Sequence, residues 1–168
     1  MNRATGLAFV ALAACGDAAN IADPASPCGA DYATVVRVLD GDTLELRDGR
    51  HVRVIGVDAP ELHSSKSPEC YASEAATYLR ELVEGREIAL TYDDQGCEDR
   101  YGRTLAHVES SDGDVAELLV TRGLACAYFV PPIGADRRAE IAGYEFEARA
   151  RRRGLWYTCA ADLPDCAR

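Results

Sequence analysis

The feature that most constrains this chain is an arginine inside an apolar strand that ends in an acidic turn. Residues 52–61 read Val-Arg-Val-Ile-Gly-Val-Asp-Ala-Pro-Glu. Burying Arg53 among β-branched residues is costly unless an anion meets it, and the carboxylates of Asp58 and Glu61 are ligands that a hard cation prefers. The pattern therefore predicts that charges of both signs gather where this strand ends.

Two other segments carry side chains of the same kinds. Residues 40–43 read Asp-Gly-Asp-Thr, and residues 99–103 read Asp-Arg-Tyr-Gly-Arg. They add carboxylates, an aromatic ring and two guanidinium groups. A guanidinium fork can bind two phosphate oxygens at once, and carboxylates can hold the cation that polarises a phosphate. If the fold brings these segments together, they suit metal-assisted phosphodiester chemistry.

The net charge limits how such a site could bind a polyanion. The chain has 168 residues and a formal charge of −10. That charge has the wrong sign for a protein that holds nucleic acid by nonspecific neutralisation of phosphates. A cationic cleft can still coexist with an acidic surface, because the local field guides a ligand. With 48% hydrophobic residues, the chain can build the core of one domain.

The first residues are typical of an export signal. A basic start is followed by the apolar run 6–14 and then Cys15, which predicts a signal peptide over residues 1–14. Leu-Ala-Ala-Cys at residues 12–15 resembles the lipobox of bacterial lipoproteins, although an ordinary signal peptide before a chance cysteine also fits. We expect an exported lipoprotein of the cell envelope, periplasmic or on the outer surface, that is anchored to a membrane through Cys15.

The chain changes character at about residue 32. Residues 15–31 are small, polar and proline-containing, and we expect them to be a flexible tether behind the lipidated cysteine. Beyond them, hydrophobic periods and turn residues predict strands over 34–39, 43–47, 50–57, 87–92 and 104–109, and helices over 67–85, 114–122 and 135–153. Asp48-Gly49 predicts a hairpin turn. Five short strands with inserted and appended helices indicate a small barrel of the α+β class.

Cysteine usage agrees with export. Apart from Cys15, the chain has six cysteines, which is an even number and favours disulfides in an oxidising compartment. No C-x-x-C pair indicates a structural zinc site. Six cysteines allow 15 pairings, and their spacing alone leaves all of them open. His51, His63 and His107 share no ligand spacing, so we assign no metal to them.

Taken in order, the three charged segments resemble the staphylococcal nuclease (thermonuclease) family. Gly-Leu-Ala at residues 123–125 and Gly-Leu-Trp at residues 154–156 extend the similarity, which covers about residues 34–156. The resemblance implies a five-stranded OB-fold β-barrel with three helices over residues 32–158, followed by a tail over residues 159–168. It also implies a calcium-dependent enzyme, which we expect to be a monomer, that hydrolyses DNA and/or RNA. In this family the 5′-oxygen leaves and the products end in 3′-phosphate.

The resemblance assigns a role to each acidic position. Asp42 and Asp58 match the carboxylates that bind calcium, and the backbone carbonyl of Ala59 completes the protein ligands. Glu61 matches the carboxylate that positions the attacking water. Asp42 and Glu61 have simpler alternatives, since Asp-Gly-Asp alone is typical of a turn and Glu61 alone could be a solvated loop acid.

The resemblance also assigns the cationic and aromatic positions. Arg53 and Arg103 match two catalytic arginines. The alternative for Arg53 is a structural ion pair, and the alternative for Arg103 is a surface charge. Tyr101 resembles a tyrosine beside the bound nucleotide. Tyr128 and Phe129 lie near the segment that supplies base-stacking aromatics, although Phe129 could equally belong to the core.

Comparison with the family suggests two disulfides. The segment after Gly123 should pack near the chain end, which implies a Cys126–Cys159 bond. A Cys70–Cys97 bond would link the start of the first helix to the loop before Asp99. Each bond would be worth ~2–4 kcal/mol through the unfolded state.

A second function fits the same fold. A non-catalytic OB-fold module on an envelope lipoprotein could hold nucleic acid or a protein without cleaving it. We would expect such a module to have lost at least one of the matched charged residues. The chain retains all five of them, Asp42, Asp58, Glu61, Arg53 and Arg103, which favours the nuclease.

Overall fold

The computed structural model of the chain describes residues 27–63 and 67–167. The predicted signal peptide, the lipidation site at Cys15 and most of the predicted tether lie outside these residues. Within the described part of the chain, no helix combines the length and apolar character needed to cross a bilayer.

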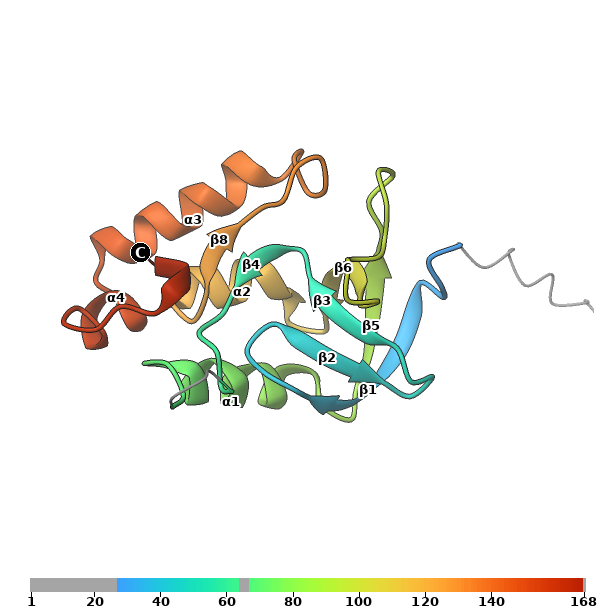
Figure 1. Cartoon of the computed structure of the whole chain (residues 1–168), viewed down its shortest axis with the longest axis horizontal. Coiled ribbons are helices and arrows are strands. Elements are labelled where there is room, and N and C mark those ends of the chain that lie inside the picture. The colour runs from blue at the N-terminus through green and yellow to red at the C-terminus, as the bar shows by residue number, and fades with distance from the viewer. Residues whose placement is uncertain (1–26, 64–66, 168) are drawn as a thin grey trace, which may run out of the picture.

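The centre of the structure is a closed β-barrel (Figure 1). Its strands are β1 (Tyr32–Val38), β2 (Thr43–Leu46), β3 (His51–Val54), β5 (Glu87–Thr91) and β6 (Thr104–Ser110). Neighbours pair antiparallel in the order β3-β2-β1-β5-β6, and a parallel pairing of β3 with β6 closes the barrel. The short strand β7 (Gly113–Asp114) extends the sheet beside β6. The predicted α+β OB-fold barrel is therefore confirmed.

The hairpin between β2 and β3 forms as Asp48-Gly49 predicts. Gly49 has a φ of 87°, which a residue without a Cβ adopts at little cost. The Asp48 carboxylate accepts a hydrogen bond from the Arg50 amide, and the Leu46 amide donates to the Arg50 carbonyl across the turn. This hairpin sets the register in which Thr43 lies opposite Arg53.

The predicted strand over residues 50–57 is two strands. Gly56 has a φ of 93°, and the chain turns there to begin β4 (Gly56–Asp58). β4 leaves the barrel and pairs antiparallel with β8 (Cys126–Tyr128), which the hydrophobic pattern does not predict. In this ribbon Asp58 lies opposite Cys126. The end of the arginine-bearing segment is thus carried out of the barrel wall.

Three helices lie close to the predicted positions. They are α1 (Ala72–Val83), α2 (Val115–Arg122) and α3 (Arg138–Ala150). α1 starts later than predicted because Tyr71 adopts a left-handed φ of 74°, whereas Asp114 caps α2 by accepting the Glu117 amide. α3 packs against α2 and β8, on the side of β8 away from the barrel (Figure 1). A short helix α4 (Leu155–Thr158) and a 3-10 turn η1 (Asp165–Ala167) end the described chain.

The core fills the barrel and continues under α1 and α2. Its largest fully buried side chains include Leu44, Leu46, Val52, Leu79 and Leu119. A second apolar cluster gathers Cys126, Leu155 and Cys159, with Cys70, Trp156, Leu163 and Cys166 packed against it. The C-terminal residues therefore have apolar packing of their own.

Both predicted disulfide pairings are wrong. The cysteines named for them are all oxidised, but the bonds are Cys28–Cys97, Cys70–Cys159 and Cys126–Cys166. The chain end does return to β8, as the family comparison suggests, yet Cys166 meets Cys126 there. Cys159, which follows α4, is bonded to Cys70 instead.

The predicted tether ends earlier than residue 31. Cys28 is bonded to Cys97, its carbonyl accepts a hydrogen bond from Arg50, and the Ala30 carbonyl accepts one from the Tyr92 hydroxyl. A disulfide and two hydrogen bonds tie this segment to the barrel. The folded unit therefore includes residues 28–31, and the predicted boundary at residue 32 is corrected accordingly.

Candidate active site

Arg53 is the centre of the charged cluster. Its Nη2 contacts Asp58 Oδ1 at 2.7 Å and Asp42 Oδ2 at 3.1 Å. Its Nη1 donates to the carbonyls of Val57, at 2.6 Å, and Val54, at 3.1 Å. The side chain is only 11% exposed. As the strand pattern predicts, the arginine in the apolar segment is met by carboxylates from two segments.

Asp42 is the most buried acid of the cluster. It is 4% exposed, and its Oδ2 also accepts the Ala59 amide at 2.8 Å, while its Oδ1 accepts the Thr43 hydroxyl at 3.0 Å. Burial raises the pKa of Asp42 to about 7. The positive charge of Arg53 opposes this rise, and the negative charge of Asp40 adds to it. One guanidinium group shared between two carboxylates does not compensate for the loss of water.

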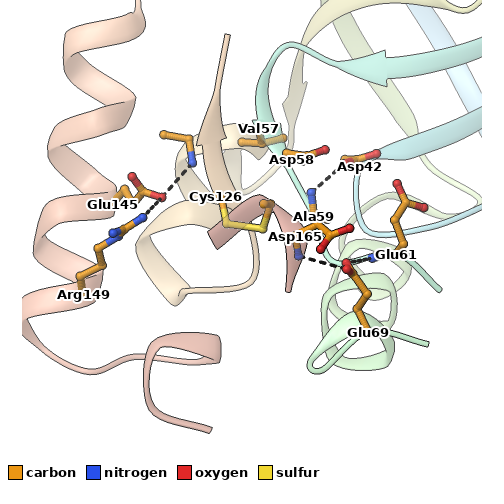
Figure 2. The surroundings of a disulfide bond; sticks show 12 residues. Asp42, Val57, Asp58, Ala59, Glu61, Glu69, Cys126, Glu145, Arg149 and Asp165 are labelled. Atoms are coloured by element: carbon orange, nitrogen blue, oxygen red, sulfur yellow. Dashed lines mark hydrogen bonds and ion pairs between the residues drawn. A yellow bond between two sulfur atoms is a disulfide. The ribbon is translucent and has the colours of Figure 1, made fainter. Parts of the chain in front are cut away.

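The neighbouring acids share this environment. Burial, with contributions from Glu69 and Asp40, raises the pKa of Asp58, while Arg53 lowers it. Partial burial raises the pKa of the Glu61 carboxyl as well, and the negative charges of Asp40 and Asp58 add to the effect. Figure 2 shows the Glu61 carboxylate on the side of its loop that faces Asp42. All three acids therefore favour a further cation nearby.

The donor set fits a hard divalent cation. It offers carboxylate oxygens of Asp42 and Asp58, which both contact Arg53 Nη2, and oxygen is the ligand type that calcium takes. Burial raises the pKa of both groups, so their ionised forms would be stabilised by a further cation. Ala59 is buried and contacts Asp42 through its amide, which brings its backbone to the same place.

Arg103 reaches the same cluster from another segment. Its Nε contacts Asp99 Oδ2 at 2.7 Å, and its Nη1 lies 3.5 Å from the Thr43 hydroxyl, which in turn donates to Asp42. The Asp99 carboxylate also accepts the Arg103 amide. Thr43 therefore links the second arginine to the buried acid, a role that the sequence pattern did not reveal.

A cleft joins the arginines to the aromatic residues. It has a volume of about 480 Å³, and its lining includes Arg53, Arg103, Tyr101, Tyr128 and Phe129. Tyr101 is 67% exposed and Tyr128 is 50% exposed, so both rings are open to a ligand. The structure thus brings together, along one cleft, all the cationic and aromatic positions that the sequence singles out.

Packing bears on Phe129 and on the basic run at residues 149–153. Phe129 is partly buried against the main core, and it also lines the cleft. The basic run at the end of α3 is paired within the helix, since Arg149 contacts Glu145 and Arg151 contacts Glu147. Arg149 also stacks 4.0 Å from the Trp156 ring. These contacts support a structural interpretation of that run.

A second group of possible metal ligands comes from segments that share no motif. Ligand atoms of Asp93, His107 and Asp136 lie within 4.8 Å of one another. The two Asp93 oxygens already accept the amides of Gln95 and Gly134. Burial lowers the pKa of His107, which favours the neutral imidazole. These hydrogen bonds account for the placement of Asp93 without a metal.

Gly41 provides the space in which the acidic turn packs. A Cβ on this residue would lie 2.5 Å from the Cβ of Ala59 and 2.9 Å from that of Ala75. Gly41→Ala should therefore push the Asp42 turn away from the Ala59 segment and lower stability by ~1–3 kcal/mol. Urea unfolding beside Gly143→Ala, whose Cβ would meet nothing within 4 Å and whose φ is not left-handed, separates crowding at Gly41 from the general effect of replacing a glycine by alanine. If both variants lose the same stability, crowding at Gly41 is not the cause.

Known proteins are similar in sequence to this chain over most of its length. The family model described as staphylococcal nuclease homologue matches residues 51–158. An uncharacterized endonuclease of Escherichia coli is 35% identical over 133 residues, covering 77% of this chain and 79% of that protein. A thermonuclease of Staphylococcus hyicus is 35% identical over 126 residues, or 73% of each chain. A micrococcal nuclease of Shigella flexneri is 34% identical over 151 residues, covering 82% of this chain and 81% of its own.

Proposed function

Because this chain belongs to the staphylococcal nuclease homologue family, we propose that it is a calcium-dependent nuclease that hydrolyses phosphodiester bonds of DNA and/or RNA. The 5′-oxygen leaves, and the products end in 3′-phosphate. The observation that carries the proposal is the position of Arg53, which contacts Asp42 and Asp58 and also lines the cleft that holds Arg103 and the aromatic rings.

The acidic residues have two different roles, cation binding and proton transfer. Asp42, Asp58 and the Ala59 carbonyl would hold calcium, which supplies Lewis acidity toward a phosphate oxygen when it is bound. Glu61 accepts a proton from the attacking water. Because the surrounding protein and acids raise the pKa of Glu61, its carboxylate is a better base than an ordinary glutamate near neutral pH.

Arg53 must exchange partners to act on a phosphate. Each of its two terminal nitrogens already contacts two oxygens of the protein. A cation held by Asp42 and Asp58 would compete with Nη2 for their carboxylate oxygens. Nη2 would then be available to donate to a phosphate oxygen that enters from the cleft. Arg103, whose side chain is 31% exposed, needs no such release to donate to the same phosphate.

The aromatic side chains provide a surface for bases. Tyr101 lies between two guanidinium groups, at 4.7 Å from Arg100 and 5.6 Å from Arg103, so its ring stays near the cationic end of the cleft. Tyr128 and Phe129 line the same cleft. Stacking on such rings tolerates any base, which agrees with a nuclease that does not select a base sequence.

The test is cleavage of end-labelled single-stranded DNA by the disulfide-bonded protein, in millimolar calcium and in excess chelator. We expect cleavage in calcium alone, with fragments that phosphatase converts to 3′-hydroxyl ends. Glu61→Gln should lower kcat by about a hundred-fold or more. Binding of the DNA without cleavage in calcium would overturn the proposal and favour the non-catalytic module.

We also propose that the domain is tethered to a membrane of a bacterial cell envelope through a lipid on Cys15. The support is the Leu-Ala-Ala-Cys sequence at residues 12–15. The full-length protein should sediment with membranes after export, and Cys15→Ser should release it into the soluble fraction with its three disulfides intact. Equal partitioning of the two proteins would contradict lipidation.

A further inference from the structure

Glu69 holds the loop that carries Glu61. Its Oε2 accepts the Glu61 amide at 2.9 Å, and its own amide donates to the Glu61 carbonyl, also at 2.9 Å. The two residues therefore close the segment between β4 and α1 at its base. Because the side chain of Glu69 binds the backbone of Glu61, the Glu61 carboxylate stays available to the cluster (Figure 2).

The other oxygen of Glu69 reaches the far end of the chain. Oε1 accepts the amide of Asp165, in η1, at 3.0 Å. One carboxylate thus joins the Glu61 loop to the C-terminal tail, and Figure 2 shows both hydrogen bonds meeting at its side chain. A charged acceptor forms stronger hydrogen bonds to amides than a neutral one does.

Covalent bonds hold both sides of this contact. Cys70, which follows Glu69, is bonded to Cys159, and Cys166, which follows Asp165, is bonded to Cys126. Cys126 in turn lies opposite Asp58 in the β4–β8 ribbon. The tail is therefore bonded to β8, the strand that pairs with β4 and lies opposite Asp58.

Packing supports the same arrangement. The two disulfides belong to the apolar cluster beside α4, in which Cys126 and Cys159 are each 1% exposed. Leu163 and Ala167 of the tail pack against that cluster. The tail is thus held by a disulfide and by apolar packing, and its Asp165 amide donates to Glu69.

We propose that Glu69 is a positioning residue that holds Glu61 in place by binding the disulfide-anchored tail with one oxygen and the Glu61 amide with the other. The kinetic consequence rests on the proposed nuclease function. The geometric consequence does not, because the hydrogen bonds order the Glu61 backbone whatever the chemistry is.

The test compares three variants with the wild type. They are Glu69→Ala, Glu69→Gln and a double variant that carries both Cys126→Ser and Cys166→Ser. Glu81→Ala, which removes an exposed carboxylate from α1, is the matched control. We expect Glu69→Ala to lower kcat about tenfold with an unchanged KM for single-stranded DNA. Glu69→Gln, which keeps one acceptor oxygen, should lose less, and Glu81→Ala should lose nothing.

A double-mutant cycle separates positioning from general damage. In a Glu61→Gln background, Glu69→Ala should cause no further loss, because the group that it positions is already gone. Equal losses in both backgrounds would overturn the proposal, since Glu69 would then act independently of Glu61.

Amide hydrogen exchange tests the geometry without any activity. Exchange at Glu61 should rise about tenfold or more in Glu69→Ala and should also rise in the paired cysteine variant, but not in Glu81→Ala. Unchanged exchange at Glu61 in Glu69→Ala, or in the cysteine variant, would overturn the proposed support. If the wild type fails to cleave DNA while exchange behaves as expected, the nuclease proposal fails and the positioning role stands.

Discussion

Arg103→Ala is expected to lower kcat for single-stranded DNA by about a thousand-fold while the protein stays folded. Loss of a preorganised donor to developing negative charge costs ~10²–10³ in rate in other enzymes, and a charged fork directed at a phosphate belongs to the upper end of that range. Arg103 lines the cleft, and its ion pair with Asp99 lies at the half-exposed surface. Loss of such an ion pair changes stability by ~1 kcal/mol or less.

Two further variants make this result specific. Arg103→Lys keeps the charge without the planar fork, so it should recover only a small part of the lost rate. Arg47→Ala removes an exposed guanidinium group next to β2 and should leave kcat unchanged. The measurement is kcat in saturating calcium, with the thermal midpoint of each variant recorded in parallel. An Arg103→Ala protein that kept a tenth of the wild-type kcat would contradict the assigned role.

The barrel could be predicted because its determinants are local. Alternating burial in β3, β5 and β6 and the turn at Asp48-Gly49 are encoded within a few residues along the chain. The break at Gly56 and the strand β8 could not be predicted in the same way. β8 has three residues and forms only because β4 leaves the barrel and offers it a partner.

In the candidate site, too, only some of the residues could be predicted from the sequence. Arg53 and its acids were predictable because a charged residue in an apolar strand demands a partner, and Asp42 and Asp58 supply it. Thr43 and Glu69 act through hydrogen bonds to distant residues, and no spacing along the chain encodes such contacts.

The disulfides were mispaired for a similar reason. Similarity to the family located the segments that carry Cys126 and Cys159 but did not define the course of the tail. Residues 159–167 return far enough to bring Cys166, not Cys159, to Cys126. Pairing follows the three-dimensional path of the tail, which is shaped by the apolar cluster beside α4.

The calcium-free protein should lose stability as the pH rises from about 4 to about 7. Burial raises the pKa of Asp42 from 3.8 to about 7 in the folded protein, so over this interval the folded state binds a proton that the unfolded state has lost. Raised pKa values of Asp58 and Glu61 act in the same direction. The lowered pKa of His107 acts in the opposite direction, up to its ordinary value of 6.5.

Asp42→Asn isolates the buried acid from these other groups. In chelator, the wild type should lose a few kcal/mol of stability between about pH 5 and about pH 8 relative to Asp42→Asn, because asparagine does not titrate. Asp94→Asn, which changes an exposed acid, should follow the wild type. Thermal or urea unfolding at each pH measures the difference. Parallel curves for wild type and Asp42→Asn would show that Asp42 does not titrate in this interval.

Calcium should offset this loss. A cation that binds the ionised carboxylates of the folded state stabilises it more as those groups lose their protons, so the calcium-induced rise in thermal midpoint should grow as the pH approaches about 7 and level off above it. The same rise should be small in Asp42→Asn at every pH, because one of the two carboxylate ligands is gone. A pH-independent rise that persists in Asp42→Asn would place the calcium elsewhere, and the Asp93, His107 and Asp136 group would then be the next to change.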